Sequence, residues 1–480
     1  MNAIPRHLLG LYAATSGFIL MVFELSAARL LAPTIGSSMY VWTSVIGVIV
    51  LALSLGFWFG GRLADQRNRP TDIAVLYGFV AISIAATLIV QGGVLQDLSQ
   101  STLDARLKAV VASFALFAPT SFVIGVLGPY LAKFNVRSLS ASGRSIAQLD
   151  ALNSIGGITG TFLAGFVLFG YFGVRDILLA LVVIAFIMSW MVMPQWRTKE
   201  RAGITIGTLL AVAVFQMPSQ VISLDTPSGH YTVERIEKPT HTEIHLATGP
   251  RASQSGIIEG APDTLLFWYT QQMAALVEKK KTVDKTPIDT ILVLGGGAYT
   301  LPQYLAHRYP DTQIDVVEID PKLIDIARHY FEYSDPANVH SYAVDARTYV
   351  NTTKKQYDVV LVDVFGHDQT PFTFVTEEYG AAVRKIVNDD GIIAVNIIGG
   401  AKGACRQVFD ATVAPYSAHF THGSYIYRNS ADPSGNIMAV FGSRSWSRPM
   451  GHDTIDPVDR PVFTDDFAPT ERLASTCRST

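Results

Sequence analysis

Glycines and carboxylates follow hydrophobic runs at four successive places in the second half of the chain. The first run ends in Gly295, Gly296 and Gly297, and the next three runs end in Glu318, Asp345 and Asp363. Short runs of Ile, Leu and Val bounded by turn residues are typical of buried strands. Glycines at a strand end let a ligand approach the backbone and let the following helix begin close to it. The four strand ends therefore form a candidate ligand site.

The spacing of the first two features indicates what the ligand is. Glu318 lies 21 residues beyond Gly297, where an acidic residue accepts hydrogen bonds from a ribose diol. The glycine pattern of dinucleotide-binding proteins is incomplete, because Thr300 occupies the place of its last glycine. We predict an adenosine-type ligand. NAD remains possible on these elements alone, and the alternative is a set of surface carboxylates beside a structural turn.

The elements that position these residues alternate between strand and helix. We predict strands over residues 289–297, 313–320, 339–345, 357–364 and 391–398, and helices over residues 301–308, 322–331, 376–387 and 403–413. Such alternation gives a mostly parallel, Rossmann-like α/β sheet with helices on both faces, and ligands bind at the carboxyl ends of its strands. The stretch 229–256 alternates as a small antiparallel β unit would, and the tail after residue 444 shows little periodicity.

The first half of the chain differs from the second half in hydropathy and charge. The whole chain is 49% hydrophobic and only 16% charged, with a mean hydropathy of +0.28. Its net charge of -3 is a cancellation, since residues 1–218 carry +6 and residues 219–480 carry -9. Apolar runs near 8–31, 39–61, 73–95, 109–132, 154–173, 174–194 and 202–218 are about as long as a membrane span. We predict an all-α transmembrane bundle of six or seven helices.

The predicted domains follow from this contrast. They are a multi-pass transmembrane domain (1–218), a small β part (219–285), a Rossmann-like nucleotide-binding domain (286–445) and a polar C-terminal tail (446–480). This composition excludes a disordered protein and a basic nucleic-acid-binding protein. Cys405 and Cys477 are too far apart for a zinc motif, and two cysteines make no disulfide framework. We therefore expect no metal and no nucleic acid partner.

Basic residues in the short loops predict the orientation of the bundle. Those after the second, fourth and sixth spans are Arg62, Arg67, Arg69, Lys133, Arg137, Arg144, Arg197, Lys199 and Arg201. With six spans the second half of the chain is cytoplasmic, and with seven it lies on the far side. We predict a multi-pass protein of the cell (inner) membrane with a cytoplasmic second half.

Two features within the spans invite a hypothesis. Glu24 lies in the first apolar run, and a carboxylate in a membrane is a functional candidate by default. A structural partner on another helix is the alternative. Gly156, Gly160 and Ala164 repeat at every fourth residue, a spacing that permits close helix contact or arises by chance in a glycine-rich helix.

Several motifs resemble those of the spermidine synthase (polyamine aminopropyltransferase) family. They are Val293-Leu294-Gly295-Gly296-Gly297, Val316-Val317-Glu318-Ile319-Asp320-Pro321, Val344-Asp345-Ala346-Arg347, Tyr357-Asp358-Val359-Val360-Leu361-Val362-Asp363 and Thr376-Glu377-Glu378-Tyr379. Upstream, residues 231–236 and 251–273 resemble the N-terminal β region of that family. The whole chain resembles the bacterial form that is fused to a multi-span membrane region.

The resemblance implies roles for individual residues. The donor would be decarboxylated S-adenosylmethionine or S-adenosylmethionine itself, bound by Gln254, Gly295, Gly296, Gly297, Glu318, Asp345 and Ala346. Glu318 would hold the ribose and Asp345 the adenine amino group, while Asp363 would orient and deprotonate the attacking amine of a polyamine. Tyr269, His367, Asp368 and Tyr379 are the candidate substrate residues.

Two positions depart from the family pattern, both at the amine end of the site. Ala298 stands where the family usually has an acidic residue, and Gly366 stands where it has a second aspartate. The leading hypothesis is a membrane-bound aminopropyltransferase that alkylates a small cationic amine such as putrescine and releases methylthioadenosine. The alternatives are a transferase that uses S-adenosylmethionine on a membrane-associated acceptor, and a transporter or sensor with a nucleotide-binding domain. The lipid bilayer is the other expected partner, and a homo-oligomer is left open.

Overall fold

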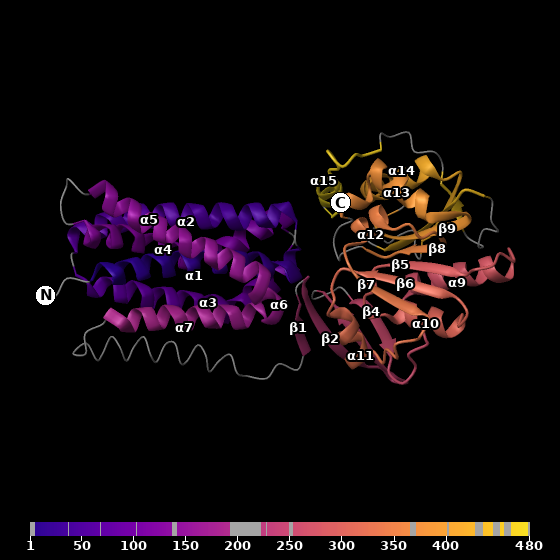
Figure 1. Ribbon diagram of the computed structural model, residues 1–480, viewed down its shortest axis with the longest axis horizontal. Coiled ribbons are helices and arrows are strands. Elements are labelled where there is room, and N and C mark those ends of the chain that lie inside the picture. The colour runs from indigo at the N-terminus through magenta and orange to yellow at the C-terminus, as the bar shows by residue number, and fades with distance from the viewer. Residues whose placement is uncertain are drawn as a thin grey trace. The chain divides into compact units, whose positions relative to one another are not determined.

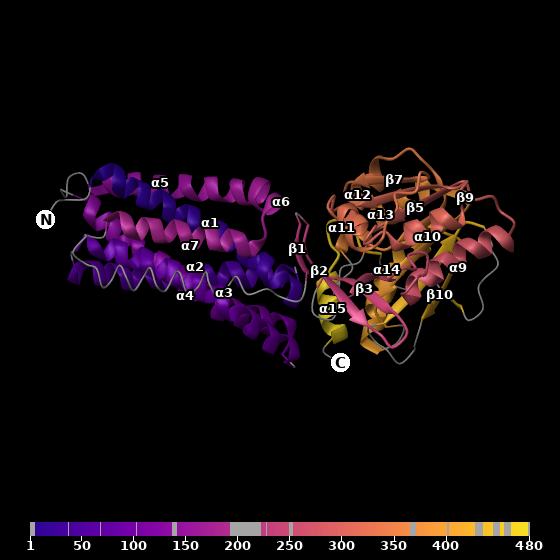
Figure 2. The same cartoon turned by 90° about the horizontal axis from the view of Figure 1, so that it is seen from below.

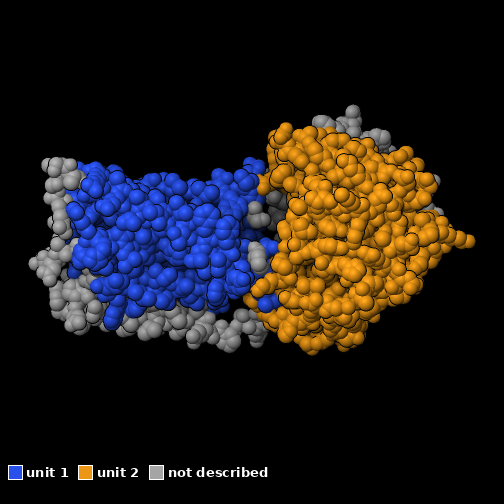
Figure 3. All heavy atoms as spheres, in the orientation of Figure 1, with its two compact units in different colours: residues 1–220, 224–230 blue, residues 221–223, 231–480 orange. Residues whose placement is uncertain are grey.

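The computed structural model describes residues 5–36, 38–67, 69–101, 103–136, 142–192, 222–226, 228–248, 253–364, 371–400, 403–427, 435–444, 452–455 and 462–478. The chain divides into two compact units (Figure 3). Unit 1 comprises residues 1–220 and 224–230, and unit 2 comprises residues 221–223 and 231–480.

Unit 1 is a bundle of long apolar helices that run side by side (Figures 1 and 2). They are α1 (Arg6–Ile35), α2 (Met39–Gln66), α3 (Thr71–Gln100), α4 (Ala105–Asn135), α5 (Ser142–Leu163), which continues through a π-helical turn (Ala164–Leu168) into α6 (Phe169–Tyr171), and α7 (Val174–Val192). Within the described residues, six helices are long and apolar enough to cross a membrane. The apolar run 202–218, the candidate seventh span, lies outside the described residues.

Glycines let α1 and α5 pack backbone to backbone. A Cβ atom added at Gly156 would lie 1.9 Å from the carbonyl oxygen of Ala14, and one added at Gly160 would lie 2.8 Å from that of Phe18. Asn153, on the same face of α5, donates a hydrogen bond of 3.1 Å to a backbone carbonyl of α1. The close contact that the glycine spacing permits is therefore confirmed.

The two charged residues in the apolar run of α1, Glu24 and Arg29, have different surroundings. The Arg29 guanidinium stacks 4.3 Å from the centre of the Phe169 ring and donates to the carbonyl oxygen of Thr226 at 3.1 Å. Glu24 is half-buried and makes no hydrogen bond or ion pair with another residue that the structure describes. The described contacts do not pair it with Arg29.

A small four-stranded sheet in the order β1-β2-β3-β4 precedes the main sheet of unit 2 in the chain. Its strands are β1 (Ile222–Asp225), β2 (His230–Glu237), β3 (Thr242–Ala247) and β4 (Ser253–Ile258). β2, β3 and β4 pair antiparallel, as the alternating pattern of residues 229–256 predicts.

The main sheet of unit 2 has eight strands in the order β12-β10-β11-β9-β8-β5-β6-β7. The strands are β5 (Thr290–Leu294), β6 (Gln313–Glu318), β7 (Val339–Ala343), β8 (Tyr357–Val362), β9 (Val387–Ile398), β10 (His422–Tyr427), β11 (Asn436–Gly442) and β12 (Asp453–Thr454). β7, β6, β5, β8 and β9 are parallel, and β11, β10 and β12 add an antiparallel edge. The predicted Rossmann-like α/β fold is confirmed.

Helices cover both faces of this sheet (Figure 1). α9 (Trp268–Thr282), α10 (Thr300–Arg308) and α11 (Leu323–Tyr330) lie on one face, and α12 (Ala346–Thr352), α13 (Glu377–Ile386) and α14 (Arg406–His419) lie on the other. Successive residues of a strand point to opposite faces, so Ile291 and Val293 belong to one buried core and Leu292 and Leu294 to the other. Both faces are buried, which explains the nearly continuous hydrophobic runs.

Other elements of unit 2 have no counterpart in the sequence prediction. These include α9, α12, the edge strands β10, β11 and β12, and the C-terminal helix α15 (Thr470–Arg478). α14 also runs past the predicted end at residue 413, with Pro415 inside it. Cys405 and Cys477 form a disulfide, a bond that the sequence prediction did not contain.

Candidate active site

Gly295 allows two strand ends to converge. It has a φ of +95°, and a Cβ atom there would lie 2.1 Å from the carbonyl oxygen of Asp363. Its N–H donates to Val317 of β6, and the N–H of Asp363 donates to Leu294 of β5, each at 2.8 Å. Only glycine accepts both this backbone conformation and this contact, so the glycine turn brings Asp363 beside the end of β5.

Glu318 holds the same turn from the neighbouring strand. Its carboxylate accepts hydrogen bonds from the N–H groups of Gly296 at 2.8 Å and Gly297 at 3.2 Å, and from that of Asp320 at 3.0 Å. Burial raises the pKa of the Glu318 carboxyl above its ordinary value, although these three N–H groups act in the opposite direction. Glu318 thus orders the glycine turn, in addition to any ligand contact that the resemblance implies.

Asp363 is the carboxylate at the centre of the site. Burial raises its pKa to about 6, and the nearby Glu318 charge adds to this effect. Asn396 donates to Oδ1 of Asp363 at 2.8 Å, and this bond, together with the nearby Tyr269 hydroxyl, lowers the pKa from the value that burial alone would give. Such a carboxyl is largely ionised at pH 7 but takes up a proton more readily than an exposed aspartate, as a general base requires.

A pair of asparagines supports Asp363 from the sheet. Asn436, the first residue of β11, donates to Oδ1 of Asn396 at 2.9 Å, and this leaves the Asn396 amide group directed at Asp363. Asn396 is only 3% exposed. Neither residue is among the sequence predictions, although an asparagine inside the hydrophobic run of β9 is a signal that could have identified Asn396.

Gln254 and Tyr269 join the site from the elements before the main sheet. The Tyr269 hydroxyl lies 2.8 Å from the carbonyl oxygen of Gln254 and donates to it. The Gln254 side-chain oxygen is buried and has no hydrogen-bond partner among the described residues. A buried polar atom without a partner is costly, so this oxygen fits a site that a polar ligand completes.

Ala298 is enclosed by protein. It is fully buried, and its N–H donates to the Ser255 hydroxyl at 3.2 Å. Ala298, which departs from the acidic residue of the family pattern, thus lies in a buried position directly after the glycine turn.

Asp345 and Ala346 lie at the end of the next strand. Glu318 pairs with Ala343 across β6 and β7, and Asp345 follows two residues later. Oδ1 of Asp345 accepts from the N–H of Thr348 at 2.8 Å and so caps α12, while Ala346 is buried as the first residue of that helix. These residues therefore follow the end of the strand that neighbours the strand of Glu318.

The structure places the four candidate substrate residues in different surroundings. Tyr269 lies in the site, as described above. Tyr379 is fully buried and packs edge-on against Phe374 and Tyr416 in the core. His367 and Asp368 lie outside the described residues, as does Gly366.

The arrangement is suited to a ligand with a nucleoside and a cationic end. Glu318 and Asp345 stand at adjacent strand ends, as a ribose and a base would require, and the glycine turn offers backbone beside them. Asp363 lies on the other side of the glycine turn and can attract a cation and accept its proton. The residues present thus fit an adenosyl sulfonium.

Comparison with known proteins identifies this part of unit 2. Residues 266–400 match the family described as spermine/spermidine synthase domain. The polyamine aminopropyltransferase of Vibrio vulnificus is 28% identical over 151 residues, which are 31% of this chain and 48% of that protein. The eEF1A lysine and N-terminal methyltransferase of Mus musculus is 29% identical over 158 residues, covering 30% of this chain and 22% of that protein.

A similar solved structure is that of a probable spermidine synthase from Corynebacterium glutamicum. It has a TM-score of 0.41 and 23% identity, and the match covers 45% of this chain and 78% of that one. The chain spans about half of the length of the Vibrio vulnificus relative, and less of the mouse one. The match to the family described as spermine/spermidine synthase domain contains the glycine turn, Glu318, Asp345 and Asp363. It lies within unit 2, and the six apolar helices of unit 1 lie outside it.

Proposed function

We propose that unit 2 is an aminopropyltransferase that uses decarboxylated S-adenosylmethionine, or a related adenosyl sulfonium, to alkylate a polyamine amine such as putrescine. The observation that carries the proposal is the buried Asp363 carboxyl, whose pKa is raised to about 6, next to the Glu318-bound glycine turn. The relative named polyamine aminopropyltransferase supports the choice of reaction.

The reaction needs one base and an activated donor. The amine nitrogen attacks the carbon of the aminopropyl group that is bonded to sulfur, an N–C bond forms, and the C–S bond breaks. Its electron pair goes to sulfur, which leaves as the neutral thioether methylthioadenosine. Asp363 takes the proton that the amine loses, because a protonated amine is no nucleophile.

Binding of the donor is assigned to the strand ends. Glu318 would accept hydrogen bonds from the ribose, and Asp345 would face the adenine amino group. The buried Gln254 oxygen would receive a donor from the ligand, which would remove its present lack of a partner. The acidic character of the second half of the chain, net -9, favours the approach of cationic substrates.

A second candidate is methyl transfer from intact S-adenosylmethionine. Ala298 favours it, because a buried alanine in place of an acid offers no counter-charge to an aminopropyl ammonium but tolerates a carboxylate. The mouse relative named as an eEF1A lysine and N-terminal methyltransferase supports this candidate. The acceptor would be a molecule associated with the membrane.

We also propose that the six apolar helices place the protein in the cell membrane with unit 2 on the cytoplasmic side. The basic loops after the second and fourth helices support this orientation. A reporter fused after Ser219 tests this orientation. A reporter found outside the cytoplasm would contradict the proposed location, and it would also contradict the enzyme proposal, because sulfonium donors are expected in the cytoplasm.

Product analysis tests the reaction itself. The full chain in detergent is incubated with putrescine and either sulfonium donor, and methylthioadenosine and S-adenosylhomocysteine are measured. Methylthioadenosine formed only with the decarboxylated donor and putrescine supports aminopropyl transfer. S-adenosylhomocysteine would replace this proposal by methyl transfer, and bound donor without either product would indicate a sensor or transporter.

A further inference from the structure

The C-terminal segment of unit 2, residues 462–478, folds back onto the start of α13. The carbonyl oxygen of Phe463 accepts from the N–H of Glu377 at 2.8 Å. Oδ1 of Asp465 accepts from the Thr376 hydroxyl at 2.7 Å, and the N–H of Asp465 donates to Glu378 at 3.0 Å. A segment that the sequence analysis treated as a polar tail thus contacts the motif at residues 376–379.

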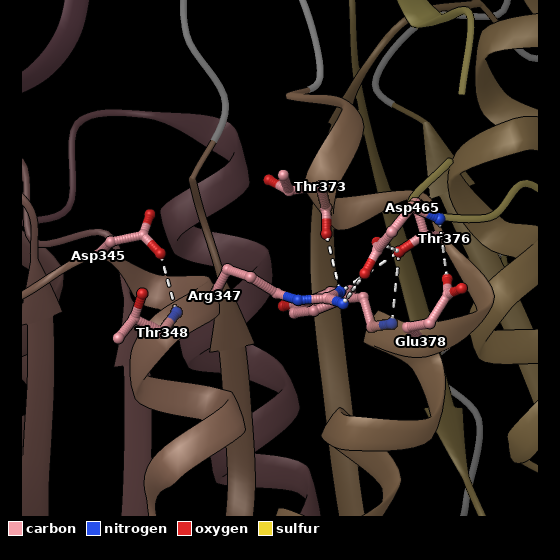
Figure 4. A network of polar contacts seen from close by, with 8 residues as sticks. Asp345, Arg347, Thr348, Thr373, Thr376, Glu378 and Asp465 are labelled. Carbon is pink, nitrogen blue, oxygen red and sulfur yellow. Dashed lines mark hydrogen bonds and ion pairs between the residues drawn. The ribbon is translucent and has the colours of Figure 1, made fainter. Parts of the chain in front are cut away.

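Asp465 also fixes an arginine beside the candidate adenine contact (Figure 4). Arg347 donates to Oδ2 of Asp465 at 2.9 Å and to the carbonyl oxygen of Thr373 at 3.0 Å. The Arg347 side chain is only 12% exposed. It follows Asp345 by two residues in the helix that Asp345 caps. Asp465 therefore ties the first turn of α12 to the segment that precedes α13.

The disulfide is the strongest attachment of this C-terminal segment. α15 has nine residues, and isolated helices of that length are marginal in water. Of its described side chains only Ala474 is a buried hydrophobic, and the preceding Phe467 is 64% exposed. Cys477 near the end of α15 is bonded to Cys405, which is 2% exposed.

We propose that residues 462–478 are a redox-controlled part of the nucleotide site, in which Asp465 is a positioning residue and the Cys405–Cys477 bond is the latch. The proposal deepens the proposed function and rests on it. With the latch closed, Asp465 holds Arg347, and α12 presents Asp345 to the adenine. With the latch open, the weakly packed α15 is released, and the Asp465 contacts are lost more easily.

The redox step is a thiol–disulfide exchange. A thiolate reductant attacks the sulfur of Cys477, which is the more exposed of the two, and Cys405 leaves as a thiolate. A second thiol completes the reduction. Oxidation by a low-molecular-weight disulfide reverses both steps, with two electrons and two protons passing from the cysteines to that oxidant. In the cytoplasm such protein disulfides are usually transient and redox-sensing.

Nucleotide affinity tests the latch. The full chain in detergent is prepared oxidised and reduced, thiol redox state is verified by maleimide labelling, and the Kd of methylthioadenosine is measured by equilibrium dialysis. We expect reduction to weaken binding on the order of tenfold, the effect of losing one charge-assisted contact. Equal affinity of the oxidised and reduced proteins overturns the proposal.

Three variants separate the latch from general damage. The double variant C405S/C477S should bind as weakly as the reduced protein and respond to no reductant. Asp465→Asn should bind weakly in both redox states, because its bond to Arg347 loses a charge. Asp389→Asn is the control, because Asp389 forms a similar ion pair with Arg384. This variant should bind methylthioadenosine as tightly as the unaltered chain does. Wild-type affinity of Asp465→Asn in the oxidised state contradicts its positioning role.

Amide hydrogen exchange of the oxidised and reduced proteins tests the latch independently of any ligand. Opening should increase exchange over residues 371–386 and 345–352, while residues 290–294 of β5 stay protected. If neither the oxidised nor the reduced protein binds methylthioadenosine, the proposed function is contradicted, whereas the exchange data still test whether the disulfide controls the Asp465 contacts. Identical exchange in the two redox states overturns it.

Discussion

The Asn396 amide donates to Oδ1 of Asp363 at 2.8 Å, and this bond opposes the effect of burial on the Asp363 carboxyl. Burial raises the pKa by disfavouring the charged form, whereas a donor to the carboxylate favours that form. The balance gives a pKa of about 6. An asparagine inside β9 thus helps to set the protonation of the proposed base.

Replacing Asn396 should move the pH profile of the reaction. In Asn396→Leu the bond that lowers the pKa is lost, so the acid limb of kcat/KM, expected near pH 6 in the unaltered chain, should move up by about one pH unit. Rates measured between pH 5 and pH 9 check this. Asn388→Leu is the matched control. Asn388 of β9 donates a hydrogen bond to Asp358 of β8, so this variant removes an equivalent Asn–Asp bond away from Asp363. An unchanged acid limb in Asn396→Leu would contradict the coupling.

Asp363→Asn should abolish turnover and leave nucleotide binding largely intact. The amide cannot accept a proton, whereas the donor-binding groups on β6 and α12 are untouched. Turnover and methylthioadenosine affinity are measured together, with Asp389→Asn as a control on the surface. Unaltered turnover would remove Asp363 as the base.

The same variant should be more stable than the unaltered chain near neutral pH. The folded-state pKa of about 6 lies above the ordinary value for aspartate of about 3.9, so folding favours the protonated form. The ionised carboxylate therefore costs stability as the pH rises through about 6, and it costs none below about 4. Asp363→Asn should gain up to about 3 kcal/mol at pH 8 and nothing at pH 4. Thermal unfolding at both pH values measures this gain. A gain in stability at pH 4 alone would contradict a raised pKa of Asp363 in the folded protein.

Glu318→Gln should weaken both the glycine turn and nucleotide binding. The carboxylate accepts three backbone N–H groups, and an amide has only one oxygen to offer them, so the loss should be about 1–3 kcal/mol of stability. Asp358→Asn is the matched control, because Asp358 also accepts backbone N–H groups, from Asp289 and Thr290. Both variants should lose stability, but only Glu318→Gln should lose methylthioadenosine affinity. Equal affinities would place Glu318 outside the ligand site.

Gly156→Ala should destabilise unit 1. The new methyl group would overlap the carbonyl oxygen of Ala14, which is backbone and cannot rotate away, so we expect a loss of about 2 kcal/mol or more. Gly143→Ala in the same helix meets nothing within 4 Å and serves as the control. Thermal stability in detergent is followed by fluorescence-detected size exclusion. A Gly156→Ala protein as stable as Gly143→Ala would show that α1 and α5 do not pack so closely.

The sequence by itself determined the elements whose signals are local. A strand buried on both faces must be a hydrophobic run, and a helix long enough for a membrane must be apolar, so residues 290–294 and 357–362 and the six long helices could be predicted directly. Gly295, Glu318 and Asp363 could be predicted as neighbours because parallel strands end at one edge of their sheet.

Only the tertiary structure decided the contacts between segments that are distant in sequence. The neighbours of Asp363 come from α9 and β9, and Asn436 joins them through an antiparallel edge strand that has no distinctive pattern. Likewise, 72 residues separate Cys405 from Cys477, and 118 separate Arg347 from Asp465. Spacing cannot predict such pairs, because chain folding rather than local periodicity brings them together.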